Sequence, residues 1–264
     1  MAQQIFQVDA FTREPFTGNP AAVCILPAGS TEERFQEIAR EMNLAETAFV
    51  APRGEEFGLR WFTPSVEVDL CGHATLASAH VLWESGLLPQ DREARFQTLS
   101  GLLVARRAGD RIELDFPAEP PEESLPPAGL LEALGIETAV FVGRNRLDHL
   151  IEVENEEVVR AISPDFRRLA GVAGRGAIVT APSADSRFDF VSRYFAPAVG
   201  VDEDPVTGST HCCLGPWWSE RLGKGVLSAW QASPRGGALE VEPRGERVLI
   251  RGQAVTVLRC ELLV

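Results

Sequence analysis

Residues 70–83 read LCGHATLASAHVLW, and the rest of the chain is organised around this stretch. A polar turn at Cys71-Gly72-His73 leads into an apolar run that contains neither Pro nor Gly. Its Ala and Ser residues let other backbone approach closely, while Leu and Trp supply surface for burial. The pattern predicts a buried helix, and the free N–H groups and positive dipole end of its first turn can hold a carboxylate.

A second copy of this arrangement lies in the other half of the sequence. Cys71-Gly72-His73 falls opposite Thr207-Gly208-Ser209, an offset of 136 residues. Gly109-Asp110-Arg111-Ile112 falls opposite Gly245-Glu246-Arg247-Val248 at the same offset. A period of this length indicates duplicated domains and not a solenoid.

Each half reads as several strands, one surface helix, more strand, one helix rich in small residues and a closing strand pair. No strand–helix alternation of the parallel-sheet type is visible. We therefore expect an α+β fold with two pseudo-symmetric domains, each a mostly antiparallel β-barrel wrapped around a central α-helix. The active site is expected in the cleft between them. A first surface helix of about three turns is expected, with Thr31 as its cap and Phe35, Ile38, Ala39 and Met42 at helical spacing.

The composition changes sharply where Pro and Glu alternate, across residues 118–128. Such a segment is typical of an exposed, stiff connector. It predicts an N-terminal domain over 1–117 and a C-terminal domain over 129–264.

The net charge of −13 argues against a nucleic-acid surface and against an anionic membrane. The five cysteines show no disulfide framework, and the first residues do not resemble an export signal. No apolar run reaches the length of about 18 residues that a membrane helix needs. We expect a cytoplasmic protein with reduced thiols.

Two residues of the first half are candidates for proton transfer. Glu46 lies between a helix and a strand in apolar surroundings, where a desolvated carboxylate serves as a general base or acid near neutrality. The alternative is a solvated Glu at a strand end. His73, in the first turn of the predicted helix, can relay a proton or bind a carboxylate, or it can simply bond a neighbouring loop.

The second helix start lies in residues 202–211, DEDPVTGSTH, the densest polar run before an apolar helix. Asp204 can cap the turn or work as an acid, and the alternative is that these carboxylates only decorate a helix N-terminus. Gly208 permits close approach of backbone to a ligand.

Cys71 at a helix N-terminus would have a lowered thiol pKa and could be a base or nucleophile. Its counterpart is Thr207, so a symmetric two-thiol mechanism is not available. A metal site is not expected, because the Cys and His residues near the two helix starts lack C-x-x-C or H-x-x-x-H spacing. These residues are Cys71, His73, His211, Cys212 and Cys213. A hydrolase using Ser209 lacks the G-x-S-x-G elbow, and no nucleotide-binding signature occurs.

Five motifs, spread through most of the chain, resemble the phenazine-biosynthesis (PhzF-like) family. They are VDAFT at 8–12, GNPA at 18–21, NLAET at 43–47, CGHAT at 71–75 and EDPVTGS at 203–209. The resemblance implies the diaminopimelate-epimerase type of fold and a homodimer. The best understood member of the family isomerises trans-2,3-dihydro-3-hydroxyanthranilate without a cofactor.

By this resemblance, Glu46 would move the proton between ring carbons. His73, Asp204 and Ser209 would line the pocket, hold the substrate and assist the transfer. The expected function is therefore a cofactor-independent isomerase that acts on a small carboxylate-bearing metabolite.

Further substrate-binding positions follow from the same resemblance. Gly72 and Gly208 would offer backbone N–H groups, Cys71 and Thr207 precede them, and Asn19 would face the substrate from a loop. Cys71 stands where phenazine enzymes have a small unreactive residue and where epimerase relatives keep a catalytic thiol. An epimerase or racemase that uses Cys71, and a non-catalytic small-molecule-binding protein, are the alternatives.

Overall fold

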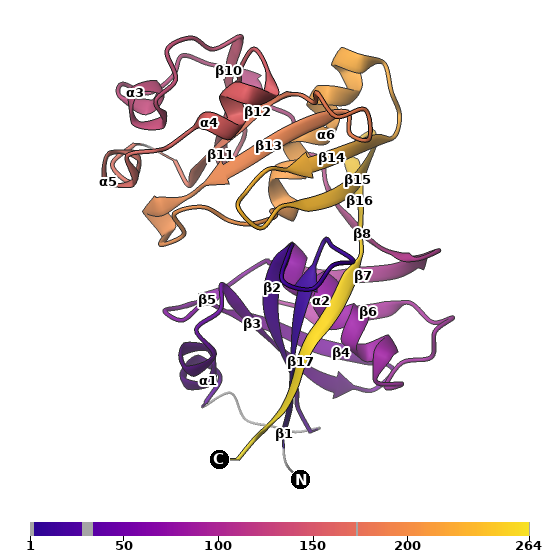
Figure 1. The fold of residues 1–264 in the computed structure, drawn as a ribbon. Coiled ribbons are helices and arrows are strands. Elements are labelled where there is room, and N and C mark those ends of the chain that lie inside the picture. Colours follow the sequence, from indigo (N-terminus) through magenta and orange to yellow (C-terminus); the bar gives the residue numbers. More distant parts are fainter. Residues whose placement is uncertain (1–2, 28–33, 173, 264) are drawn as a thin grey trace. The chain divides into compact units, whose positions relative to one another are not determined.

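The chain divides into two compact units in a computed structural model that describes residues 3–27, 34–172 and 174–263. Unit 1 comprises Met1–Asp115 and Arg251–Val264, and unit 2 comprises Phe116–Ile250. Figure 1 colours unit 1 from indigo to magenta, with the last strand of the chain in yellow. Among the described residues, every helix is too short or too polar to cross a lipid bilayer.

Unit 1 is a sheet with two helices. Its strands are β1 (Gln3–Ala10), β2 (Asn19–Ile25), β3 (Glu46–Arg53), β4 (Glu56–Phe62), β5 (Glu67–Val68), β6 (Ala94–Thr98), β7 (Gly101–Ala108), β8 (Arg111–Pro117) and β17 (Ala254–Leu262). Most neighbouring strands pair antiparallel, including β17 with β1 and β1 with β2. Two pairs are parallel, β2 with β3 and β4 with β6.

The two helices of unit 1 are the connections that these parallel pairs require, because parallel strands cannot be joined by a tight hairpin. Helix α1 (Phe35–Met42) joins β2 to β3, and α2 (Gly72–Glu84) joins β4 to β6. Helix α1 spans eight residues and contains the predicted helical positions Phe35, Ile38, Ala39 and Met42. Its predicted cap, Thr31, lies outside the described residues. The predicted buried helix is α2, which packs against β1, β2 and β3 (Figure 1). Leu76 and Leu82 on α2 are fully buried.

Unit 2 repeats this plan. Its strands are β9 (Glu122–Glu123), β10 (Phe141–Arg144), β11 (Asp148–Glu152), β12 (Gly176–Pro182), β13 (Phe190–Phe195), β14 (Leu227–Gln231), β15 (Gly237–Arg244) and β16 (Arg247–Gly252). Its helices are α3 (Leu130–Leu134), α4 (Glu156–Ala161), α5 (Phe166–Leu169), the short η1 (Pro197–Val199) and α6 (Gly208–Leu222). Strands β10 to β15 pair in the order antiparallel, parallel, antiparallel, parallel, antiparallel. Strands β1, β2, β3, β4, β6 and β7 follow the same order, which confirms the duplication.

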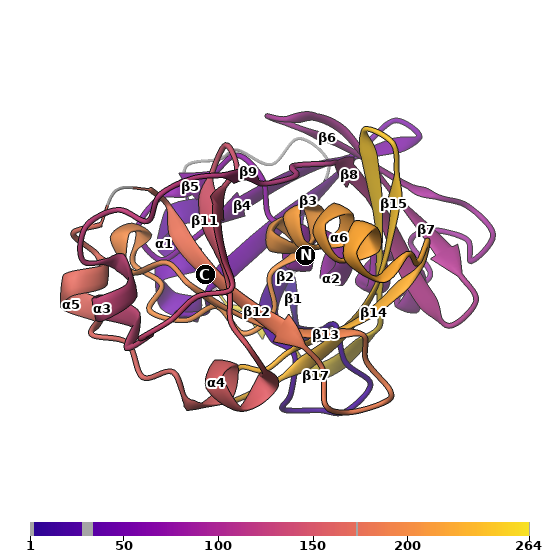
Figure 2. The same ribbon diagram turned by 90° about the horizontal axis from the view of Figure 1, so that it is seen from above.

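Helix α6 is the counterpart of α2, and Figure 2 shows β11 to β15 arranged around it. The indole of Trp218 donates to the Thr180 hydroxyl on β12 and stacks on Phe190 of β13. At Gly215, a Cβ atom would lie 2.7 Å from Val241 Cγ1, so only glycine fits against β15. The small residues of α6 therefore serve close packing, as the sequence pattern predicts.

The proline-rich segment 118–128 is bound to unit 2. Pro216 lies inside α6 and cannot donate to the carbonyl of Cys212, one turn earlier. The Glu119 N–H donates to that carbonyl instead, at 3.0 Å, and the Ala118 N–H donates to Glu246 O. Strand β9 then pairs with β10. We expected an exposed connector here. The structure instead shows a segment whose backbone pairs with the α6 carbonyl that Pro216 leaves without a helical donor.

The end of the chain also departs from the expected domain division. The predicted C-terminal domain ran to residue 264, whereas β17 pairs with β1 along Gln3–Ala10 and belongs to unit 1. Pairing between the first and last strands leaves no local pattern in the sequence. The domain boundary predicted near residue 118 lies close to the observed division at Asp115 and Phe116.

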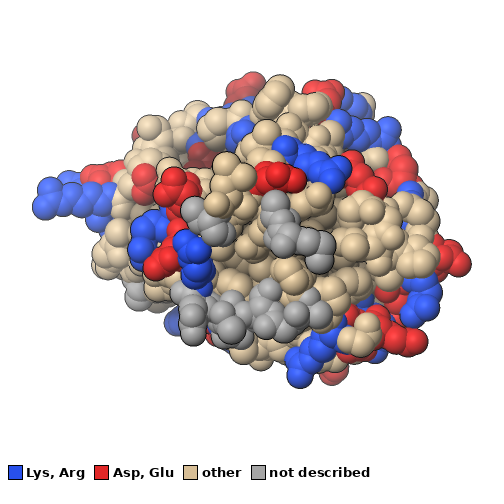
Figure 3. All heavy atoms as spheres, turned by 90° about the horizontal axis from the view of Figure 1, so that it is seen from below, with Lys and Arg blue, Asp and Glu red and all other residues tan. Residues whose placement is uncertain are grey.

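Charged side chains of both signs are interspersed on the face shown in Figure 3. Several acidic side chains are paired, among them Glu67 with Arg60 and Glu56 with Arg95. On this face the net charge of −13 is not gathered into a single acidic field.

Candidate active-site residues

Three elements of unit 1 bring Asn19, Glu46 and His73 together. Asn19 is the first residue of β2 and Glu46 is the first residue of β3, and the two strands are parallel, with Ala21 opposite Glu46. Both strands therefore begin at the same edge of the sheet. His73 is the second residue of α2, which packs against both strands.

The imidazole of His73 is held on both sides. Its Nε2 lies 3.2 Å from Glu46 Oε2, and its Nδ1 lies 3.1 Å from Asn19 Nδ2. An amide nitrogen can only donate, so a neutral His73 accepts from Asn19 at Nδ1 and carries its proton on Nε2, facing Glu46. His73 and Asn19 are buried, and the Glu46 side chain is 16% exposed. The arrangement fixes one carboxylate oxygen of Glu46 and leaves the other available for chemistry.

Cys71, the N-cap of α2, places its Sγ 3.5 Å from His73 Nδ1. Burial raises the pKa of the Cys71 thiol, the Glu46 carboxylate raises it further, and His73 only partly opposes this. The predicted lowering of the Cys71 pKa is therefore wrong, because desolvation outweighs the effect of the helix start. At neutral pH Cys71 is a thiol.

His73 responds in the opposite direction. Burial alone lowers the pKa of its imidazole, but Cys71 and Glu46 outweigh burial and raise that pKa well above 6.5. We attribute the rise chiefly to Glu46, because a protonated Cys71 contributes no charge. When His73 is protonated, its Nε2 and Glu46 Oε2 form an ion pair at 3.2 Å, and Nδ1 no longer accepts from Asn19.

Glu46, Cys71 and His73 are also the described residues whose geometry best fits a metal. One ligand atom from each lies within 4.8 Å of the others, and carboxylate, thiolate and imidazole are all zinc ligands. Of the Cys and His set considered in the sequence, Cys71 and His73 belong to this unit 1 site. Cys212 and Cys213 are buried in α6, and burial raises both thiol pKa values.

In unit 2, the start of α6 is held by a network around Thr207, its N-cap residue. The Thr207 hydroxyl donates to the Asp204 carboxylate, and the Thr207 N–H donates to Gln231 Oε1 at 2.8 Å. Gln231 Nε2 donates to the Asp204 carbonyl at 2.8 Å. Asp204 and Gln231 are buried. Sequence reasoning missed Gln231, since it lies on β14, far along the chain, in an otherwise ordinary strand.

Ser209, the second residue of α6, is bound by an arginine that sequence reasoning also missed. Arg175 Nη2 donates to Ser209 Oγ at 3.1 Å, while the same guanidinium makes two bonds to Asp148. Asp148 also accepts from the Tyr194 hydroxyl at 2.9 Å. No motif in the sequence around Arg175 and Gly176, which precede and begin β12, indicated that Arg175 binds Ser209.

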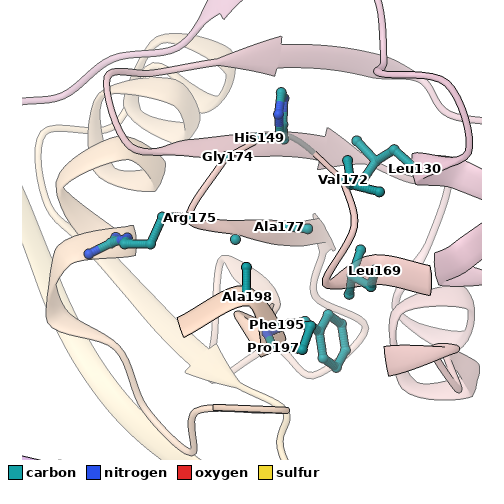
Figure 4. Close-up of a pocket in the computed structure, with 11 residues that line it drawn as sticks. Leu130, His149, Leu169, Val172, Gly174, Arg175, Ala177, Phe195, Pro197 and Ala198 are labelled. Carbon is teal, nitrogen blue, oxygen red and sulfur yellow. The ribbon is translucent and has the colours of Figure 1, made fainter. Parts of the chain in front are cut away.

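A small pocket lies beside Arg175 (Figure 4). Its lining includes Leu130, His149, Val172 and Phe195, and its volume is about 10 Å³. That is room for one water molecule, so this pocket does not hold a metabolite.

The family follows from comparison with known proteins. Residues 8–260 match the family described as phenazine biosynthesis-like protein. The chain belongs to this family. An uncharacterized isomerase of Halalkalibacterium halodurans is 52% identical over 265 residues, which cover 100% of both chains. An uncharacterized isomerase of Pseudomonas aeruginosa is 56% identical over 254 residues, or 96% of each chain.

A solved structure supports the fold of this phenazine biosynthesis-like protein. The PhzF-family protein of Enterococcus faecalis superposes with a TM-score of 0.95 at 42% identity, and the match covers 100% of both chains. The expected α+β fold and the family resemblance are confirmed. With relatives named isomerases, the prediction of an isomerase is confirmed at the level of enzyme class.

Four of the five family motifs fall at the starts of elements, and VDAFT lies at the end of β1. GNPA and NLAET open β2 and β3, CGHAT opens α2, and EDPVTGS leads into α6. Unit 1 thus brings together Asn19, Glu46, Cys71, Gly72 and His73, and unit 2 brings together Asp204, Thr207, Gly208 and Ser209.

Proposed function

We propose that this protein is a cofactor-independent isomerase that moves a proton between two carbons of a small carboxylate-bearing metabolite. The reaction is similar to that of trans-2,3-dihydro-3-hydroxyanthranilate isomerase. The observation that supports it is the contact between Glu46 and His73, with Asn19 fixing the other face of the imidazole. Asp204 and Ser209 are assigned to substrate binding.

The chemistry needs only one base. The oxygen of Glu46 that His73 does not hold takes a proton from carbon, and the electron pair of that C–H bond enters the conjugated system of the substrate. Glu46 then returns the proton to another carbon on the same face. No atom or electron is gained or lost overall. The contact with His73 keeps the Glu46 carboxylate oriented between turnovers.

Hydrogen exchange tests this proposal. In D₂O the proton that the partly exposed Glu46 carboxyl has taken exchanges with solvent before transfer to the second carbon. The wild-type protein should therefore introduce deuterium into trans-2,3-dihydro-3-hydroxyanthranilate or a related carboxylate, as followed by NMR. Glu46→Gln keeps the shape of the side chain but removes its basicity, so the exchange rate should fall by about 10²–10⁴-fold. Glu41→Gln, an exposed substitution on α1, serves as the control and should keep the wild-type rate. Undiminished exchange in Glu46→Gln would refute the proposal.

The same assay separates the epimerase or racemase that would use Cys71. Because burial raises the Cys71 pKa, Cys71→Ala should keep exchange within about 3-fold of wild type. Cys24→Ala, at another buried thiol of unit 1, is the matched control. Stereoinversion of an amino acid that is lost in Cys71→Ala alone would favour the epimerase. Ligand binding without exchange, and indifferent to Glu46→Gln, would indicate a binding protein.

The family resemblance also supports the proposal that the protein is a cytoplasmic homodimer whose partner is a small molecule and not a nucleic acid. Light scattering after size exclusion tests the assembly. A particle near the chain mass of 28.8 kDa would contradict the dimer.

A further inference from the structure

The hydroxyl of Ser209 has its hydrogen-bonding role imposed on it by Arg175. Every N–H of a guanidinium donates and none accepts, so Ser209 Oγ accepts from Arg175 Nη2 at 3.1 Å. The Ser209 hydrogen must therefore point away from Arg175. Other hydroxyls in these helices turn back on the backbone, as Ser78 does to Ala74 O and Thr210 to Thr207 O. Ser209 is instead held outward as a donor.

Arg175 is itself fixed. It makes two hydrogen bonds to Asp148, whose side chain is 1% exposed, and its guanidinium lies 5.6 Å from the centroid of the Tyr194 ring. In Figure 4 the Arg175 side chain runs away from Leu130 and Val172, on the other side of the pocket. A buried acid with two donors on it resists rearrangement, because a lost partner would leave a buried charge.

The backbone is shaped to admit this network. A Cβ atom at Gly176 would lie 2.7 Å from the Tyr194 hydroxyl, which donates to Asp148. Asn145 Oδ1 accepts from the Asp148 N–H at 2.7 Å and so anchors the start of β11. Arg175 and Tyr194, from two separate segments, thus donate to one carboxylate.

The internal duplication places Ser209 at the position that His73 has in unit 1, because each is the second residue of its central helix. By strand register, Gly176 of unit 2 corresponds to Glu46, since the next residue of each pairs with Phe195 or Phe62. Arg175 directly precedes Gly176, so a cation lies beside the position that the carboxylate occupies in unit 1.

We propose that Asp148 and Arg175 are positioning residues that hold Ser209 as a hydrogen-bond donor and so make the start of α6 selective for a carboxylate over its neutral amide. The proposal rests on the proposed function, in which Ser209 contacts the substrate. A carboxylate offers only acceptors to the Ser209 O–H and the free N–H groups of the first helical turn. An amide turns an NH₂ group toward one of these donors and leaves it unpaired.

Calorimetric binding of anthranilate and of anthranilamide tests this. The wild-type protein should bind the carboxylate about 10-fold or more tightly than the amide, as expected for a lost charged hydrogen bond. Ser209→Ala and Arg175→Lys should each bring this ratio near unity. Lysine keeps the charge beside Asp148 but lacks the fork that reaches two partners. The double variant should be no worse than either single one, because both act through one hydroxyl.

Two further variants separate positioning from general structural damage. Ser209→Thr keeps the hydroxyl and should keep the preference. Arg221→Gln is the matched control, because Arg221 lies at the other end of α6 and pairs with Glu152 at the other end of β11. Its side chain is 36% exposed against 31% for Arg175, and it also lies over an aromatic ring, that of Trp217. The carboxylate preference of Arg221→Gln should equal that of the wild type.

The proposal is overturned if Arg175→Lys keeps the preference that Ser209→Ala loses, or if the two losses add in the double variant. It is equally overturned if the wild type shows no preference, including the case in which neither compound binds. Glu46→Gln distinguishes this failure from failure of the proposed function, because it should abolish deuterium exchange and keep the carboxylate preference. Exchange without preference refutes the positioning role alone, and preference without exchange refutes the isomerase alone.

Discussion

At each helix start, a neighbouring side chain that can only donate hydrogen bonds determines where the proton of His73 or Ser209 lies. Toward the neutral imidazole of His73 Asn19 can only donate, which places the single ring proton on the side of Glu46. Arg175 can only donate toward Ser209, which turns the hydroxyl proton outward. In both cases a residue outside the helix selects the state of a residue within its first turn, so the reactive or binding atom is set before any ligand arrives.

A third buried polar residue, His211 on α6, makes the stability of unit 2 depend on pH. Burial lowers its pKa from 6.5 to about 4, although its Nδ1 donates to Thr207 O at 2.8 Å. Folded protein therefore disfavours the protonated form that the unfolded chain adopts below pH 6.5. The stabilisation by neutral His211 is complete above that pH and is lost as the pH falls toward 4. Between pH 7 and pH 5 the loss should be about 2 kcal/mol.

His211→Gln, which cannot titrate, should remove this part of the pH dependence. The measurement is hydrogen exchange of β12 and β13 amides at pH 7 and pH 5, compared between the wild type and the variant. Other titrating groups, including His73 with its raised pKa, are common to both proteins and cancel in the comparison. An equal pH dependence in the two proteins would contradict the assigned role of His211.

At this scale the sequence predicted the residues that sit in motifs. Glu46 and His73 could be found because NLAET and CGHAT are recognisable, and the structure brings the two side chains into contact. Arg175 and Gln231 could not be found, since their partners lie 34 and 24 residues away and neither sits in a distinctive pattern. The predicted lowering of the Cys71 thiol pKa was wrong for another reason. Burial, which raises this pKa, is a property of the fold, and it outweighs the local effect of the helix start.

Among the elements, the central helices α2 and α6 each have two structural roles. Helices α2 and α6 fill the inside of their units, and each also carries the chain across to a parallel strand, from β4 to β6 and from β13 to β14. The run of small and apolar residues predicted the burial. It did not predict the parallel pairs, because a buried helix inside an antiparallel barrel and a crossover helix have the same composition.

Truncation inside α2 should destabilise unit 1 strongly. Leu76 is fully buried beside Phe11 and Gly252, so Leu76→Ala leaves a cavity and should cost about 2–5 kcal/mol. Leu87→Ala, just after the helix and half exposed, is the control and should cost less than about 1 kcal/mol. Urea unfolding followed in unit 1 gives both values. A cost for Leu76→Ala no larger than that of the control would show that α2 does not pack as described.

For the molecule as a whole, the sequence predicted the duplication and the domain boundary near residue 118. It did not predict that the last strand belongs to unit 1. Equal offsets between the two helix starts and the two late turns identified the repeat. The partner of β17 could not be read in the same way, because strand pairing across the length of the chain depends on where the intervening unit folds and leaves no periodic signal.

Removal of residues 254–264 should therefore damage the first unit and spare the second. Strand β1 would lose its antiparallel partner along Gln3–Ala10. Mass-detected hydrogen exchange should show lost protection in β1 and β2, with β11 to β13 unchanged. A shorter deletion, of residues 263–264, is the control and should leave all five strands protected. Unchanged protection of β1 after the longer deletion would be inconsistent with β17 belonging to unit 1.

The pairing of the first strand with the last has a consequence for how the protein is made. The ribosome releases β1 early, but its neighbour β17 emerges only after every strand of unit 2. The order of folding during translation is thus reversed: the contiguous second unit can complete itself first, and the first unit waits with an unpaired edge. Because Glu46 and His73 lie in the waiting unit, a nascent chain can form the start of α6 before it brings these two side chains together.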